Sequence, residues 1–291
     1  MSRFLIVILF SVCSPVFAAV DFIEIKKSAL IAAASYASPK IINERLNQIE
    51  YSLVHHNVLP HSALSYFLAR SPSGVQFLSF RGTANLENAL VDLDVSLKLD
   101  TNLNIQLHQG FGAAAKAAYE DVKSKLDKSQ PVSVTGHSLG GAIAVIMAMH
   151  LQREGFLLDK VITFGQPKVT NVTGANVYDN LPLIRVVTPK DIVPLVPPLS
   201  PLQLNPLQLG DVDIFWHMGQ EVILMPKKNY AITQGLKSMM RATKFVSSVP
   251  DETNLHAHQM ATYLTLIDQK LKGAQQVPYK MDINFFGISL D

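Results

Sequence analysis

The sequence predicts an α/β fold in which helices flank a mostly parallel central sheet. Apolar segments rich in β-branched and aromatic residues alternate along the chain with segments of helical periodicity. A parallel strand pair needs a crossover connection, usually a helix, so this alternation is typical of one parallel-dominated sheet. The chain has 291 residues, of which 48% are hydrophobic and 16% charged, so it can bury a sizeable core.

The expected elements begin with helical periodicity over residues 24–50, broken near Pro39. Residues 64–70 and 75–82 are predicted to be two strands joined by a Ser-Pro-Ser-Gly turn, antiparallel at the front of the sheet. The later expected elements are a short amphipathic helix at 86–93, a strand at 104–108, a helix at 113–126, a strand at 132–136, a helix at 139–152, strands at 160–164, 183–188 and 221–225, and a last helix near 255–271.

The first 18 residues have the pattern of a secretory signal peptide. They carry one cation, Arg3, then an apolar run from Phe4 to Val12, and then the small residues that fit cleavage after Ala18. The apolar run is well short of the roughly 20 residues that a spanning helix needs. We therefore expect export, giving a secreted or periplasmic protein. Lipoprotein anchoring through Cys13 is disfavoured because Val12 stands where a small residue is expected.

We expect residues 19–291 to form a single domain with two additions. Residues from about 194 to 216 are rich in proline and are predicted to be a rigid surface insertion. Residues from about 226 to 249 hold five cations and no acid, and 234–249 separate apolar from basic positions. We predict that this basic amphipathic segment contacts an anionic membrane surface, the alternative being a solvated helix packed by its apolar stripe. The formal net charge of +2 is too small to suggest nucleic acid as a partner.

A serine flanked by glycines stands where a predicted strand meets a predicted helix, in the stretch Gly136-His137-Ser138-Leu139-Gly140. This G-x-S-x-G pattern puts the serine on a sharp turn, with glycines where a Cβ would collide with the neighbouring strand or helix. The N–H of Leu139, at a helix N-terminus, can point to a developing oxyanion. Ser138 is therefore the candidate nucleophile.

A serine nucleophile needs a base, and the base needs a carboxylate to orient it. In the α/β-hydrolase order the acid follows the serine and a histidine comes last. Asp191 follows a predicted strand and is the preferred acid. His256 and His258 both lie at the start of the last predicted helix, and their spacing alone does not choose between them. His217, just before a strand, is expected to serve packing or hydrogen bonding.

Seven separated motifs extend this pattern over much of the chain. They are SFRGT (79–83), NALVDL (88–93), HQGF (108–111), VTGHSLGGA (134–142), TFGQPKV (163–169), DIVP (191–194) and HAHQMATYL (256–264). Their order resembles that of the class 3 lipase family, the fungal-type triacylglycerol lipases with their bacterial and plant relatives, from about residue 60 to about residue 270. The resemblance implies an α/β-hydrolase fold with its nucleophile elbow at Ser138. It also implies hydrolysis of glycerolipid ester bonds, of triacylglycerol lipase or phospholipase A type, through an acyl-enzyme.

The resemblance implies a role for each matching residue. Ser138 would be the nucleophile, Asp191 the acid, and His258 the base, preferred over His256 because of the residues that follow it. Thr83 and Leu139 would form the oxyanion hole.

The remaining expectations concern supporting residues, partners and alternatives. Asn88 and Asp92 would support the oxyanion loop, since residues four apart share a helix face. No metal site, phosphate loop or nucleotide fingerprint is evident, so we expect no metal and no cofactor. The expected partner is a lipid ester, and the sequence does not indicate an oligomeric state. A short-chain carboxylesterase or an acyltransferase would use the same residues, and a non-catalytic lipid-binding module would have kept only the fold.

Overall fold

The computed structural model describes residues 20–60, 62–83, 96–197, 214–235, 238, 251–279, 283–285 and 288–290. The helices are α1 (Phe22–Ala34), α2 (Pro39–Asn47), α4 (Gln109–Val122), α5 (Leu139–Arg153), α6 (Val172–Val177), α8 (Glu252–His258) and α9 (Met260–Leu271), with short 3-10 helices η1 (Lys123–Lys125) and η2 (Val193–Leu195). The strands are β1 (Ser52–Val58), β2 (Ser65–Arg70), β3 (Gln76–Phe80), β4 (Leu97–Asp100), β5 (Ile105–His108), β6 (Val132–His137), β7 (Leu158–Phe164), β8 (Thr170–Asn171), β9 (Leu183–Val187), β10 (Phe215–Trp216), β11 (Gln220–Leu224), β12 (Asn229–Thr233), β13 (Gln275–Gln276), β14 (Ile283–Phe285) and β15 (Ile288–Leu290).

Nine of these strands form the central sheet, in the order β1-β2-β3-β6-β7-β9-β11-β12-β13. The middle strands β3, β6, β7, β9 and β11 run parallel. The front strands β1, β2 and β3 are antiparallel, as is the pair β11–β12. Parallel strands end at the same edge of a sheet, so the segments that follow β6 and β9 emerge there together. The predicted α/β fold with a mostly parallel sheet is confirmed.

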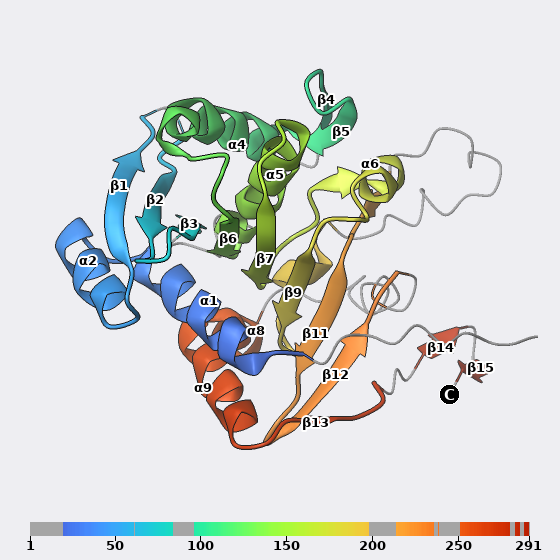
Figure 1. Ribbon diagram of the computed structural model, residues 1–291. Helices are drawn as coiled ribbons and strands as arrows, with labels where there is room; N and C mark the ends of the chain where they lie inside the picture. The colour runs from blue at the N-terminus through green and yellow to red at the C-terminus, as the bar shows by residue number, and fades with distance from the viewer. Residues whose placement is uncertain are drawn as a thin grey trace, which may run out of the picture.

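Helices cover both faces of this sheet (Figure 1). α4 and α5 pack on one face over strand residues such as Leu78 and Val134. α1 and α9 pack on the other face over Ile162 and Val222, and α2 joins α1 over Phe77. Phe77 and Leu78 of β3 enter cores on opposite faces, as the alternation of side chains along a strand requires. Because both faces are buried, the central strands are rich in apolar residues on both sides.

A second sheet of four short strands, in the order β10-β8-β5-β4, lies beside the central one. Its pairs are antiparallel, and Phe215 and Trp216 of β10 pair with Asn171 and Thr170 of β8. The C-terminal end of the predicted insertion is thereby attached to the body of the protein. Within the described residues, no helix has both the length and the apolar character that crossing a bilayer requires.

Most predicted elements lie close to their expected positions, and the differences have local causes. The last helix is broken by the extended backbone of Gln259 (φ −65°, ψ 138°) into α8 and α9. The strands β1 and β12 were not predicted. β1 carries two histidines and an asparagine, and β12 falls inside the basic segment predicted for residues 226–249. The first part of that segment, residues 229–233, pairs with β11 in the sheet, and the amphipathic stretch expected at 234–249 lies almost entirely outside the described residues.

Several predicted segments lie outside the described residues. They are the signal peptide at 1–18, the helix at 86–93, most of the insertion (198–213) and most of the basic segment (236, 237 and 239–250). The division into a signal peptide and a single domain stays a prediction.

A buried ion pair ties the parallel part of the sheet to its far edge. Arg185 on β9 and Glu221 on β11 are both about 1% exposed, and Nη1 lies 3.4 Å from Oε1. The guanidinium also donates to the carbonyl of Met218 and to Ser238 Oγ, each at 2.9 Å. Thr233 of β12 donates to the second oxygen of Glu221. The buried guanidinium is thus paired with a buried carboxylate, and both groups make further hydrogen bonds inside the protein.

We predict that Glu221→Ala lowers the free energy of unfolding by about 3–5 kcal/mol, because it leaves a buried guanidinium without its carboxylate. Urea unfolding followed by circular dichroism measures this. The control is Glu120→Ala, whose carboxylate pairs with Lys123 on the surface at 2.6 Å and whose loss should cost less than about 1 kcal/mol. Equal losses in the two variants would contradict the assignment.

Candidate active site

Ser138 occupies a strained turn between β6 and α5. Its φ is 59° and its ψ is −132°, a conformation that non-glycine residues adopt at a cost of about 1–3 kcal/mol. The surrounding structure holds it in place. The Ser138 N–H donates to the carbonyl of Phe164, and its carbonyl accepts from the N–H of Gly141, both at 2.9 Å.

The glycines around this turn are sterically required, as the sequence predicts. A Cβ on Gly136 would lie 2.2 Å from the carbonyl oxygen of Gly140. A Cβ on Gly140 would lie 2.2 Å from the carbonyl oxygen of Phe80, at the end of β3. Three backbone segments therefore approach more closely than any side chain allows, and α5 can begin directly behind Ser138.

The acid and the base predicted from the sequence are in contact. Asp191 is fully buried in the turn after β9, and His258 is 4% exposed at the end of α8. The Nδ1 atom of His258 lies 3.0 Å and 2.9 Å from the two carboxylate oxygens of Asp191. The Tyr263 hydroxyl donates to Asp191 Oδ2 at 2.5 Å, and the Val193 N–H donates to Oδ1 at 2.9 Å.

The hydrogen-bond donors around Asp191 keep its carboxylate ionised. Burial by itself would raise the pKa of Asp191, but the charge and hydrogen bond of His258, with the bonds from Tyr263 and Val193, lower that pKa below its ordinary value. Asp191 is therefore an ionised acceptor at neutral pH, and Nδ1 of His258 must carry a proton. The lone pair of the neutral ring is left on Nε2.

The two atoms that a serine–histidine couple would use have no partner within the part of the chain that the structure describes. Ser138 Oγ and His258 Nε2 are both buried and make no hydrogen bond there. The ring of His137, the residue before Ser138, lies 4.5 Å from the ring of His258 between centroids. A potential nucleophile and a potential base thus lie in the same buried region.

Two further glycines let the backbone pass close to the side chains of this region. A Cβ on Gly165, which has a φ of 57°, would lie 2.7 Å from Asp191 Oδ2 and 2.8 Å from His258 Cε1. A Cβ on Gly82 would lie 2.9 Å from the Cβ of Ser138. Gly82 therefore lies directly beside the serine.

The structure describes the two residues predicted to form the oxyanion hole, but not the two predicted to support it. Leu139 is the first residue of α5, where an N–H has no intrahelical acceptor. Thr83 is exposed and follows Gly82 directly, at the end of a described range. Asn88 and Asp92, the predicted supports of this loop, lie outside the described residues.

The other candidate histidines lie elsewhere. His256 is exposed, and its carbonyl accepts from Thr262 Oγ1 at 2.8 Å. His217 Nε2 lies 2.6 Å from the carbonyl oxygen of Pro194, in the hydrogen-bonding role expected of it. Only His258 of the three is bonded to Asp191 among the described contacts.

Sequence reasoning missed four residues that shape the site. Two of them had a signal in the sequence: Gly165 is the glycine of the TFGQPKV motif, and Tyr263 lies in the motif that contains His258. His137 was given no role, although it stands inside the G-x-S-x-G stretch. Tyr36 carries no sequence signal, yet its hydroxyl lies 2.8 Å from His137 Nδ1.

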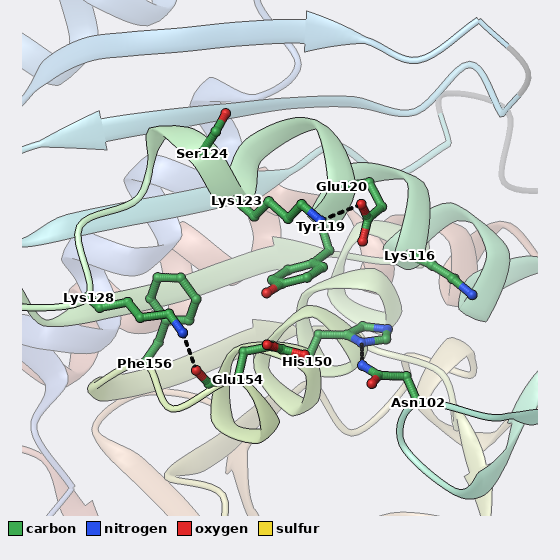
Figure 2. Close-up of a pocket in the computed structure, with 10 residues that line it drawn as sticks. All are labelled: Asn102, Lys116, Tyr119, Glu120, Lys123, Ser124, Lys128, His150, Glu154 and Phe156. Atoms are coloured by element: carbon green, nitrogen blue, oxygen red, sulfur yellow. Dashed lines mark hydrogen bonds and ion pairs between the residues drawn. The ribbon is translucent and has the colours of Figure 1, made fainter.

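A cavity of about 590 Å³ lies on another part of the surface, between α4 and α5 (Figure 2). Two of its lysines are engaged locally: Lys123 pairs with Glu120 at 2.6 Å, and Lys128 donates to the carbonyl of Glu154 at 2.5 Å. None of the predicted site residues lines it. Within the described ranges, no cluster of three or more histidine, cysteine or acidic side chains could hold a metal ion.

The comparison with family models matches residues 77–200 to the family described as Lipase (class 3). The matched range includes the elbow and Asp191 and ends before His258.

Individual relatives point to the same family. A lipase of Rhizomucor miehei is 36% identical over 137 residues, 43% of this chain and 38% of the relative. A secreted mono- and diacylglycerol lipase 1 of Fusarium solani is 31% identical over 131 residues, 42% of this chain and 39% of the relative. The chain thus spans about two fifths of the length of these curated relatives.

The fold matches over a longer stretch. A solved triacylglycerol lipase, described as having a serine protease triad as its catalytic centre, aligns with a TM-score of 0.54 and 26% identity. The alignment covers 70% of this chain and 80% of that one. The fold is therefore that of the α/β hydrolases.

We predict that Tyr263→Phe lowers the free energy of unfolding by about 2 kcal/mol at pH 7, because it removes a hydrogen bond to a buried charge. The sign with pH follows from Asp191. The pKa of Asp191 is lower in the folded protein than in the unfolded chain, where it is near 3.9. Its ionisation therefore stabilises the folded state at pH values above the unfolded pKa, and this stabilisation is lost as the pH falls through the folded pKa. Loss of the donor raises the folded pKa. Urea unfolding should therefore show a difference between variant and wild type that is full at pH 6–8 and shrinks below about pH 4. A difference independent of pH would contradict this.

Proposed function

Because this chain belongs to the class 3 lipase family, we propose that it is a serine ester hydrolase that cleaves the carboxylic ester bonds of glycerolipids, as a triacylglycerol lipase or phospholipase A does. One observation carries the proposal. Among the described residues, Nε2 of the buried, hydrogen-bonded Asp191–His258 pair and the hydroxyl of Ser138 at the elbow both lack a hydrogen-bond partner.

The reaction would begin with attack of Ser138 Oγ on the ester carbonyl carbon, while Nε2 of His258 takes the hydroxyl proton. Asp191 would hold the ring in the tautomer that accepts this proton and would stabilise the imidazolium. His258 would then return the proton to the departing alcohol, leaving an acyl group on Ser138. A water, deprotonated by His258, would attack the acyl-enzyme, releasing the fatty acid and restoring the serine.

The tetrahedral intermediates carry a negative oxygen that needs donors. Leu139 is the first residue of α5, where a backbone N–H has no acceptor within the helix, and Thr83 follows the glycine that contacts Ser138. We propose that these two residues form the oxyanion hole, each donor contributing about 3 kcal/mol to the transition state. Asn88 and Asp92 would steady the loop that carries Thr83.

The lipid substrate class is proposed from the relatives, whose names include a mono- and diacylglycerol lipase. A short-chain carboxylesterase or an acyltransferase would use the same residues, and the chain-length test below separates them. The Fusarium relative is named as a secreted lipase, which supports the proposal of export through residues 1–18. Contact with a lipid surface through residues 226–249 stays a prediction.

We predict that a fluorophosphonate probe labels the protein covalently at Ser138 and that Ser138→Ala abolishes labelling and lowers kcat on esters by about 10⁴–10⁶-fold. Ser133→Ala is the matched control, since Ser133 is a buried serine on β6, the strand that leads to Ser138, and donates to Asp159 at 2.9 Å. Mass spectrometry locates the label. Labelling retained in Ser138→Ala would reject the proposed nucleophile.

We predict that kcat/KM on nitrophenyl esters rises with acyl chain length to about eight carbons or more, because each buried methylene contributes about 0.8 kcal/mol. Initial rates on a series from acetate to palmitate measure this. A maximum at two to four carbons would favour the carboxylesterase. A transfer product that exceeds the free acid in the presence of an added alcohol would indicate an acyltransferase, and the absence of both labelling and turnover would indicate a binding module.

A further inference from the structure

His137 is next to the proposed nucleophile in the chain and contacts the proposed base in space. It precedes Ser138 in the chain and is 6% exposed. Its Nε2 lies 2.7 Å from the backbone carbonyl oxygen of His258, and its Nδ1 lies 2.8 Å from the hydroxyl of Tyr36. One imidazole therefore bridges two segments that are 121 and 101 residues away from it in the sequence.

The chemistry of the partners fixes the protons in this bridge. A carbonyl oxygen can only accept, so Nε2 of His137 carries the proton and donates it to His258. Nδ1 is then the lone-pair nitrogen, and the Tyr36 hydroxyl must donate to it. Burial, followed by the neighbouring His258, lowers the pKa of His137 to about 3, so the ring stays neutral at ordinary pH.

The carbonyl of His258 needs such a donor because the helix breaks there. α8 ends at His258, and the extended Gln259 separates it from α9. The N–H of Thr262, which would reach His258 in a continuous helix, donates to the carbonyl of Gln259 at 2.9 Å instead. His137 supplies the missing donor and so holds the backbone of His258 in place.

Tyr36 connects the same bridge to the proposed oxyanion loop. Burial raises the pKa of Tyr36 to about 12, and the backbone N–H of Gly82, which donates toward the phenol oxygen, opposes this rise. A Cβ on Gly82 would lie 2.6 Å from that oxygen. The phenol thus touches Gly82 on one side and bonds to His137 on the other. Tyr36 comes from the N-terminal helical region, for which the sequence gave no functional role.

We infer that Tyr36 and His137 are positioning residues of the proposed hydrolase. The chain of bonds from Tyr36 to His137 to the carbonyl of His258 fixes the base relative to Ser138, and the contact of Tyr36 with Gly82 aligns the oxyanion loop with both. Neither side chain touches the substrate or exchanges a proton in the reaction. The inference rests on the proposed function.

The test compares purified variants of the full chain in two assays: the second-order rate of fluorophosphonate labelling at Ser138, and kcat and KM on a soluble nitrophenyl ester. His137→Leu should lower the labelling rate and kcat about 100-fold, the effect of a displacement of about 1 Å in a reacting group. Tyr36→Phe should lower them about 10-fold, as loss of one buried hydrogen bond does. KM should change less than about threefold in both, because the residues act on alignment and not on binding.

His137→Gln provides the rescue. A glutamine amide N–H can reach the position of Nε2 and donate to the His258 carbonyl. We expect it to recover at least about tenfold of the activity lost in His137→Leu. A residue that only filled space would not show this recovery.

Two controls separate alignment from packing. Tyr51→Phe alters another buried tyrosine of the same layer, packed on Phe77. His150→Gln alters a buried histidine beside the cavity between α4 and α5. Both should label and turn over within about twofold of wild type, and thermal unfolding of every variant reports its folding.

The outcomes distinguish the inference from the function on which it rests. A wild-type protein that is not labelled at Ser138 overturns the proposed function and the inference with it. Normal labelling in wild type together with rates within twofold of wild type in Tyr36→Phe overturns the inference alone, even if His137→Leu fails to fold. Folded His137→Gln and His137→Leu with equal losses also overturn it.

Discussion

The close approach of three backbone segments at Ser138 is the constraint on which the rest of the structure depends. The end of β3, the turn after β6 and the first turn of α5 meet at separations that only glycines at 136 and 140 permit. The same packing holds Ser138 at a positive φ. It also brings Gly82, which follows β3, beside the serine. The position of the Ser138 turn, the start of α5 and the placement of Gly82 thus follow from one steric condition.

The second requirement is a carboxylate kept charged inside the protein. Burying an ionised group is costly unless hydrogen bonds and an opposite charge replace the water it loses. Asp191 receives bonds from His258, Tyr263 and the Val193 N–H, which together lower its pKa despite complete burial. The loop beyond it is anchored by Lys168, whose ammonium donates to the carbonyls of Leu195 and Pro197 at 2.8 Å and 2.7 Å. Burial lowers the pKa of Lys168 to about 7, and it can donate both bonds in either protonation state.

The sequence predicted the parts of this site that depend on local chemistry. Strand and helix propensities on either side of Ser138 were enough to locate the turn and explain its glycines. Asp191 was found because side chains that follow a parallel strand gather at one edge of the sheet. The polar strand β1 and the short strand β12 were missed, because their residues do not show the apolar runs of the central strands. Two residues that are two positions apart on a helix face nearly opposite directions. The sequence does not say which of these faces meets Asp191, so it could not choose between His256 and His258.

What the sequence determined by itself is therefore the alternation of strands and helices and the sharp turn at the serine, which sterics within a few residues impose. The tertiary structure alone decided that His258 rather than His256 meets Asp191, and that Tyr36 and His137 join this region. The physical reason is that such contacts unite side chains and backbone carbonyls more than 100 residues apart. They depend on how helices pack across a sheet and on where α8 breaks, and neither is encoded in a local pattern.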